Sequence, residues 1–106
     1  MSETADDLLA SATEWVERHR DSCAARGVEL GVERAPDGRD NPSLWIDFAG
    51  KDRLARLTLW ASGEAVLAAV EVSSGSVLPE VQLEVADAGA LEVVFGRAVA
   101  AVAGIR

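Results

Sequence analysis

His19 and Cys23 are the side chains in this sequence best suited to nucleophilic chemistry, because a nearby imidazole can activate a thiol. They lie four positions apart in a segment with helical periodicity, so they are neighbours on one face of a predicted helix. That face also carries the apolar residues of the helix, which favours a packed cysteine and a histidine at the edge of the core. No third group is placed to orient the imidazole. We therefore predict no catalytic residue.

Carboxylates are numerous, but they form no pattern typical of a metal site or an acid–base pair. Asp37, Asp40 and Asp52 lie in predicted loops, and they do not follow the pattern of a calcium-binding loop. A single histidine and a single cysteine give little support to a transition-metal site. The glycine-rich stretch 73–76 lacks a P-loop lysine and does not open a helix. The sequence predicts no metal, no cofactor and no enzymatic activity.

Two tryptophans carry the clearest functional signal. They occur in the neighbouring strand-like runs 43–48 and 56–60, whose aliphatic residues already supply a core face. Successive side chains of a strand point to opposite faces, so Trp45 and Trp60 are predicted to lie on the face away from the core. Large rings in that position indicate a contact surface rather than a reaction centre.

The same alternation, applied to these two runs and to the other strand-like runs, adds further residues to this outer face: Glu29, Glu33, Asp47, Arg56, Thr58, Leu67, Glu71, Gln82 and Glu84. Trp and Arg are enriched at binding hot spots, and an acidic rim suits a basic partner. We predict a partner-binding site composed of Trp45, Asp47, Arg56, Thr58, Trp60, Glu71 and Glu84. Two alternatives remain open: the rings pack on each other or on Arg56, or a terminal segment covers them.

The elements that position this face follow from hydrophobic periodicity. An amphipathic helix is predicted from about Thr4 to Arg26, with Gly27 after its end and with Trp15 in its apolar stripe. Asp87 is the predicted N-cap of a second helix that continues to about Ile105. Between the helices lie five strand-like segments, 28–33, 43–48, 56–60, 65–72 and 80–85.

Consecutive strands joined by short turns predict an antiparallel meander. A two-residue turn at Ser62-Gly63 would place Leu59 opposite Val66 and Thr58 opposite Leu67. Each helix has one apolar stripe, so both can cover the same face and leave the other open. The predicted fold class is α+β: an antiparallel five-strand meander with the N-terminal and C-terminal helices packed on one face, in a single domain over residues 1–106.

The composition limits the partners. A net charge of −8 and a pI near 4.5 argue against nucleic acid and favour a basic protein partner, although acidic surfaces also simply keep proteins soluble. No run approaches the ~20 apolar residues of a membrane span. The N-terminus carries acidic residues instead of the positive region of a signal peptide. We therefore predict a cytoplasmic protein without a membrane segment.

Part of the sequence resembles a known family. The stretch Asn41-Pro42-Ser43 with Asp47, followed by Arg56-Leu57-Thr58-Leu59-Trp60 and Ser62-Gly63-Glu64, is similar to the TriTu family of immunity proteins against bacterial polymorphic toxins. Trp15 and Trp60 match the tryptophans of that family's first helix and of its Leu-Thr-Leu-Trp-x-Ser-Gly hairpin. The resemblance implies a cytosolic antidote that binds and neutralises a cognate toxin by occlusion.

A second function fits the same features. Small acidic α+β proteins also serve as chaperones for secreted effector proteins, and such chaperones can be dimers. The predicted second helix favours this alternative, because Val93, Gly96, Ala100 and Ala103 make its outer side only weakly polar. A homodimer through that side is compatible with the sequence.

Overall fold

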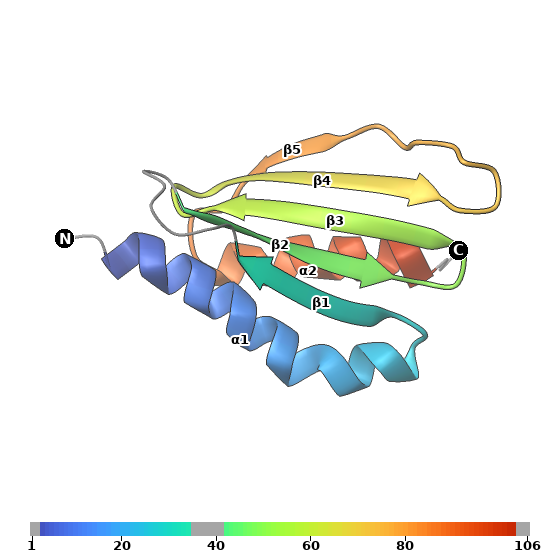
Figure 1. The fold of residues 1–106 in the computed structure, drawn as a ribbon. Coiled ribbons are helices and arrows are strands. Elements are labelled where there is room, and N and C mark those ends of the chain that lie inside the picture. Colours follow the sequence, from blue (N-terminus) through green and yellow to red (C-terminus); the bar gives the residue numbers. More distant parts are fainter. Residues whose placement is uncertain (1–2, 35–41, 104–106) are drawn as a thin grey trace.

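The computed structural model describes residues 3–34 and 42–103, which form a sheet with two helices behind it (Figure 1). The elements in chain order are α1 (Glu3–Ala25), β1 (Glu29–Arg34), β2 (Ser43–Ala49), β3 (Arg53–Trp60), β4 (Glu64–Glu71), β5 (Val81–Glu84) and α2 (Ala88–Ala103). In this part of the chain the strands form one antiparallel sheet in the order β1-β2-β3-β4-β5. Helix α1 runs along β1, and α2 lies behind β2 and β3. The predicted α+β meander is confirmed.

Both helices are capped as their sequences predict. Gly27 adopts a φ of +84°, and the amides of Gly27 and Val28 donate to the carbonyls of Ala24 and Cys23 at 2.9 and 2.8 Å. This pair of bonds is a Schellman motif, which favours glycine at the left-handed position. At the start of α2, the Asp87 carboxylate accepts the amide of the third helical residue at 2.9 Å. Neither described helix is both long and apolar enough to cross a membrane.

The core lies between the sheet and the helices. The largest fully buried side chains from the strands are Leu44, Ile46, Phe48, Leu57 and Leu59. They alternate along β2 and β3 with the residues of the opposite face, as the sequence predicts.

Trp15 joins the two helices. Its side chain is 5% exposed, and its ring centroid lies 4.4 Å from that of Phe95 in α2. Its indole N–H donates to a carboxylate oxygen of Glu92 at 3.3 Å. One side chain of α1 therefore makes both an apolar and a polar contact with α2.

The predicted pairing of β3 with β4 is wrong by one residue. Leu59 lies opposite Ala65, Leu57 opposite Leu67, and Thr58 opposite Val66. The cause is the turn, which has three residues, 61–63, instead of two. Gly63 has a φ of +102° and donates its amide to the Trp60 carbonyl at 2.8 Å. A left-handed glycine at the third position is the usual way to close a three-residue hairpin.

Strand β1 forms one edge of the sheet. A guanidinium N–H of Arg20 in α1 donates to the Leu30 carbonyl of this strand at 2.7 Å. The same guanidinium is paired with Glu17 at 2.9 Å. The helix thus supplies a hydrogen bond to a strand carbonyl. The predicted loop after β1, with Asp37 and Asp40, lies outside the described residues.

Candidate functional site: the open face of the sheet

The face of the sheet turned away from both helices is the candidate site (Figure 1). The strand register arranges its side chains in rows that cross the sheet. One row contains Glu33, Trp45, Thr58, Val66 and Gln82. The next contains Gly31, Asp47, Arg56 and Ala68. A third contains Glu29, Ala49, Leu54, Val70 and, through an isolated bridge, Val77.

An ion pair lies in the middle of this face. Arg56 Nε donates to Asp47 Oδ1 at 2.7 Å, and Arg56 Nη2 donates to Asp47 Oδ2 at 3.0 Å. The guanidinium carbon lies 5.2 Å from the ring centroid of Trp45. The hydrogen bond to Asp47 raises the pKa of Arg56, although burial opposes this rise. The two-point geometry fixes both side chains, and the guanidinium covers the ring as in a cation–π contact.

The two outer tryptophans are half-buried. Trp45 lies beneath Arg56, and its indole nitrogen is buried without a hydrogen bond to any described residue. The packing of a ring on Arg56, left open by the sequence, is therefore what the structure shows for Trp45. Trp60 lies at the end of β3, opposite Ser43.

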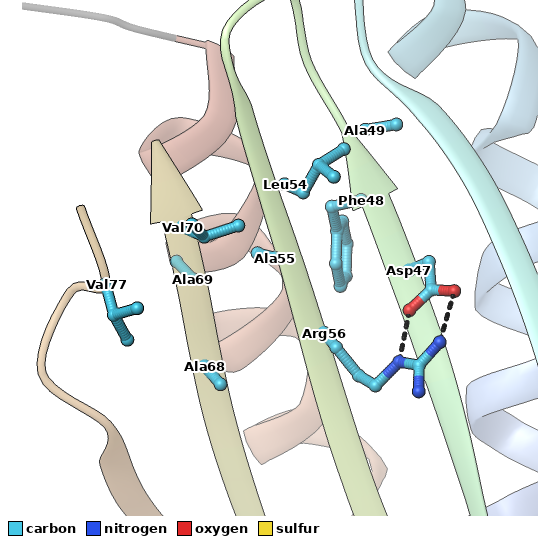
Figure 2. A pocket seen from close by; sticks show the side chains of 10 residues that line it. All are labelled: Asp47, Phe48, Ala49, Leu54, Ala55, Arg56, Ala68, Ala69, Val70 and Val77. Atoms are coloured by element: carbon cyan, nitrogen blue, oxygen red, sulfur yellow. Dashed lines mark hydrogen bonds and ion pairs between the residues drawn. The ribbon is translucent and has the colours of Figure 1, made fainter. Parts of the chain in front are cut away.

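The open face is hollowed on the side of the Asp47–Arg56 ion pair that lies away from Trp45. The hollow has a volume of about 470 Å³. Figure 2 shows the side chains that line it: Asp47, Phe48, Ala49, Leu54, Ala55, Arg56, Ala68, Ala69, Val70 and Val77. Leu54 is 46% exposed and Val77 is 77% exposed. Small alanine side chains between larger aliphatic ones create the hollow. Sequence reasoning missed this feature, because the register error put Leu67 in place of Val66 and Ala68 on this face.

A family model described as Immunity protein TriTu matches residues 10–101. The chain belongs to the TriTu family of immunity proteins. Among curated proteins, none matches it. The family match extends beyond the hairpin seen in the sequence and reaches into α2, so the family pattern includes the helix layer as well as the open face.

Most of the predicted site residues of this TriTu protein share the open face. Trp45, Asp47, Arg56 and Thr58 are directly adjacent across β2 and β3. Trp60 follows Thr58 by two residues, so their side chains are neighbours on the same face of β3. Whether these residues contact a partner stays a prediction.

The remaining predicted residues lie apart from this group. Glu84 of the TriTu protein is on the open face at the edge strand β5, directly opposite Glu64. The expected outward position of Glu71, and likewise of Leu67, is wrong. Glu71 lies on the helix side of β4, opposite Arg53, and pairs with it at 3.8 Å. The physical reason is the one-residue register shift, which exchanges the two faces of β4.

The His19–Cys23 pair is a packed feature of the TriTu protein. Cys23 is buried, and this burial raises the pKa of its thiol, with Arg26 opposing the shift. His19 Nδ1 lies 2.9 Å from the Trp15 carbonyl oxygen, to which it donates in the matching tautomer, and its ring stacks on Trp15 at 4.3 Å. A raised pKa lowers the thiolate fraction, which a nucleophilic cysteine needs. Within residues 3–34 and 42–103, no three metal-binding side chains form a group.

Proposed function

We propose that this protein binds a toxin domain through the open face of its sheet and neutralises it by occluding the toxin's active site or substrate groove, without chemistry of its own. The observation that carries the proposal is the face itself, which joins half-buried tryptophans, a fixed ion pair and exposed aliphatic side chains on a surface not covered by α1 or α2. Such a combination is typical of protein interfaces. Membership in an immunity family makes a toxin the expected partner.

Charge supports a basic toxin surface. Glu29, Glu33, Glu64 and Glu84 point to the open face, and none of them forms an ion pair with a described residue. Arg56 points from β3 to this face, and Asp47 already engages it. The free carboxylates would attract a basic partner and raise the rate of association. In this proposal, the protein binds the toxin in the cytoplasm.

The experiment that tests the proposal first searches the neighbouring gene for a C-terminal toxin domain and then uses that domain. Cells that express that domain should survive when the unaltered chain is co-expressed, and the purified pair should bind. Arg56→Ala should weaken binding, because it removes the central ion pair and uncovers Trp45. Arg18→Ala is the matched control: it removes an exposed ion pair with Glu92 on the helix side at 3.6 Å. Failure of the unaltered chain to rescue cells would end the proposal.

The chaperone alternative rests on α2. Val93 on its outer side is 64% exposed, with the exposed Gly96 and Ala100 beside it. Light scattering separates the two functions. A monomer that binds a folded toxin domain supports immunity, whereas a firm dimer that holds an unfolded segment of its partner supports the chaperone.

A further inference from the structure

We propose that the hollow between β2, β3 and β4 is the anchor site for the toxin, and that it receives an apolar side chain that basic residues flank in the toxin. This inference rests on the proposed function. It adds to the tryptophans an aliphatic contact made by Leu54, Ala68, Val70 and Val77.

The lining of the hollow selects an apolar occupant. Leu54, Val70 and Val77 lie with Ala49 in one row across the sheet, and Ala68 lies in the next row, as Figure 2 shows. Leu54 and Val77 leave much of their apolar surface in water, and an apolar group that enters the hollow would remove that surface from water. Hot spots are usually anchors that fill pockets of this kind.

The polar groups of the hollow argue against a small polar ligand. Ligand pockets orient their ligand with a few convergent polar groups. Here the charged lining residues are Asp47 and Arg56, and their bidentate bonds of 2.7 and 3.0 Å join them to each other. This pair is the charged edge of the hollow and the other lining side chains are apolar, so few polar groups converge on a ligand. An apolar side chain leaves the pair intact.

The rim that carries Val77 is held in place. Asp52, in the turn between β2 and β3, accepts the Ser73 amide at its Oδ1 and the Ser73 hydroxyl at its Oδ2, both at 3.0 Å. The Val72 amide donates to the Asp52 carbonyl at 2.7 Å, and the Leu78 amide donates to β4 at 2.9 Å. These bonds tie the segment after β4 to the neighbouring turn. A rim that is already ordered reduces the entropy lost on binding.

The acidic residues of the open face indicate which charge the toxin surface around the anchor should carry. Glu64 and Glu84 lie directly opposite each other across β4 and β5. Like charges in this position destabilise a sheet, and neither carboxylate has an ion-pair partner among the described residues. Glu29 lies in the same row as Leu54, near the hollow. Lysine or arginine residues beside the anchor would compensate the charge of Glu29. Glu64 and Glu84 lie at the opposite end of β4 from the hollow, and they would attract basic residues elsewhere on the toxin surface.

The Trp45 end of the face is less suited to receive an anchor. Arg56 already covers the Trp45 ring, so a partner must either displace the guanidinium or contact it. The hollow needs no such displacement. We therefore infer that the aliphatic hollow receives the toxin side chain. Trp45 and Arg56 form the wall beside it.

The first test fills the hollow. Ala68→Phe places a ring in it from a half-buried position on the open face, and should weaken binding to the adjacent-gene toxin domain at least about 30-fold. Ala10→Phe is the matched control, since it makes the same change at an exposed position of α1, away from the open face, and should change affinity by less than about 3-fold. Equal effects of the two variants would overturn the assignment of the anchor.

A second set of variants keeps the inference testable if Ala68→Phe impairs folding. Val77→Ala removes exposed apolar surface that the fold does not need, and should weaken binding about 10-fold with an unchanged melting temperature. Asp52→Ala should weaken binding by freeing the rim, whereas Asp52→Asn keeps a group that can bond Ser73 and should bind nearly as the unaltered chain does. Full affinity in Val77→Ala and Asp52→Ala would refute the inference.

A cross-link identifies the occupant directly. A photoreactive benzoylphenylalanine at position 77 should react with an apolar residue of the toxin domain that has lysine or arginine within a few positions. Cross-links to an acidic segment would contradict the proposed chemistry. If the unaltered chain does not bind the toxin domain, the proposed function fails and this inference fails with it. If it binds and the hollow variants bind equally well, only the anchor is wrong.

Discussion

Replacing Trp15 with alanine should remove a large share of the stability of this fold. The ring is 5% exposed, stacks on His19 with centroids 4.3 Å apart and contacts Phe95 at 4.4 Å. Because α1 and α2 come from opposite ends of the sequence, this side chain helps hold the helix layer together. The cavity left by its removal would lie between the two helices.

The magnitude follows from the buried area and from the hydrogen bond. A buried aromatic ring removes roughly 150–250 Å² from water, which corresponds to about 4–6 kcal/mol at ~25 cal/mol per Å². Measured losses for tryptophan-to-alanine changes in cores are about 3–5 kcal/mol. The bond from the indole N–H to Glu92 adds about 1 kcal/mol or less, because the Glu92 side chain is largely in water. We expect a loss of about 4 kcal/mol from a total of roughly 5–15 kcal/mol.

Urea unfolding followed by far-ultraviolet circular dichroism measures this loss. With an m value of about 2 kcal/mol/M, the midpoint should fall by about 2 M. Glu92→Ala is the control, because it removes the acceptor and leaves the ring; it should cost about 1 kcal/mol or less. If Trp15→Ala costs no more than Glu92→Ala, the ring does not hold the helix layer and the reasoning is refuted.

Other predictions concern the open face, a turn and the cysteine. Trp60→Ala should weaken toxin binding by about 2 kcal/mol or more, yet cost only about 1–2 kcal/mol of stability, because the ring is half-buried. Melting temperature and affinity from one preparation test this, and a collapse in melting temperature without a binding defect would place Trp60 in the core. Gly63→Ala should cost about 1–3 kcal/mol, because its φ is +102° and a Cβ would meet a backbone carbonyl; Gly75→Ala, with a φ of +73° and open space around it, should cost less in the same urea assay. Equal losses would refute the steric explanation. Burial raises the pKa of Cys23 above its ordinary value of 9.0, so the folded state holds the thiol proton more tightly than the unfolded state does. The resulting stability is complete below the unfolded pKa and is lost as pH rises towards the folded one. Unfolding free energies between about pH 7 and about pH 10 should therefore decline in a way that Cys23→Ala does not share.

Elements with strong periodicity could be predicted from the sequence. The alternation in β2 and β3 correctly placed Trp45 and Arg56 away from the core, since each strand carries enough aliphatic residues to define its buried face. The caps at Gly27 and Asp87 were also predictable, because their chemistry is local.

Strand β4 could not be assigned in the same way. Its run Ala65-Val66-Leu67-Ala68-Ala69-Val70 is apolar on both faces, so periodicity does not show which residues are buried. The turn decides the register, and a three-residue turn with Gly63 differs from a two-residue turn by one position. Which residues line the hollow depends on this register. Val77 joins the lining because it pairs with Val70 in an isolated bridge, and no local sequence pattern indicates that bridge.

The contact of Arg20 with the Leu30 carbonyl has a consequence for self-association. An exposed edge strand is a template on which a strand of another molecule can pair, and this pairing starts many aggregates. At β1 the guanidinium occupies the carbonyl that such a strand would need, and its ion pair with Glu17 keeps it there. A growing stack of chains would first have to displace this charged group. Helix α1 therefore completes the core and also hinders the pairing of another strand with β1. The open face of the sheet stays accessible.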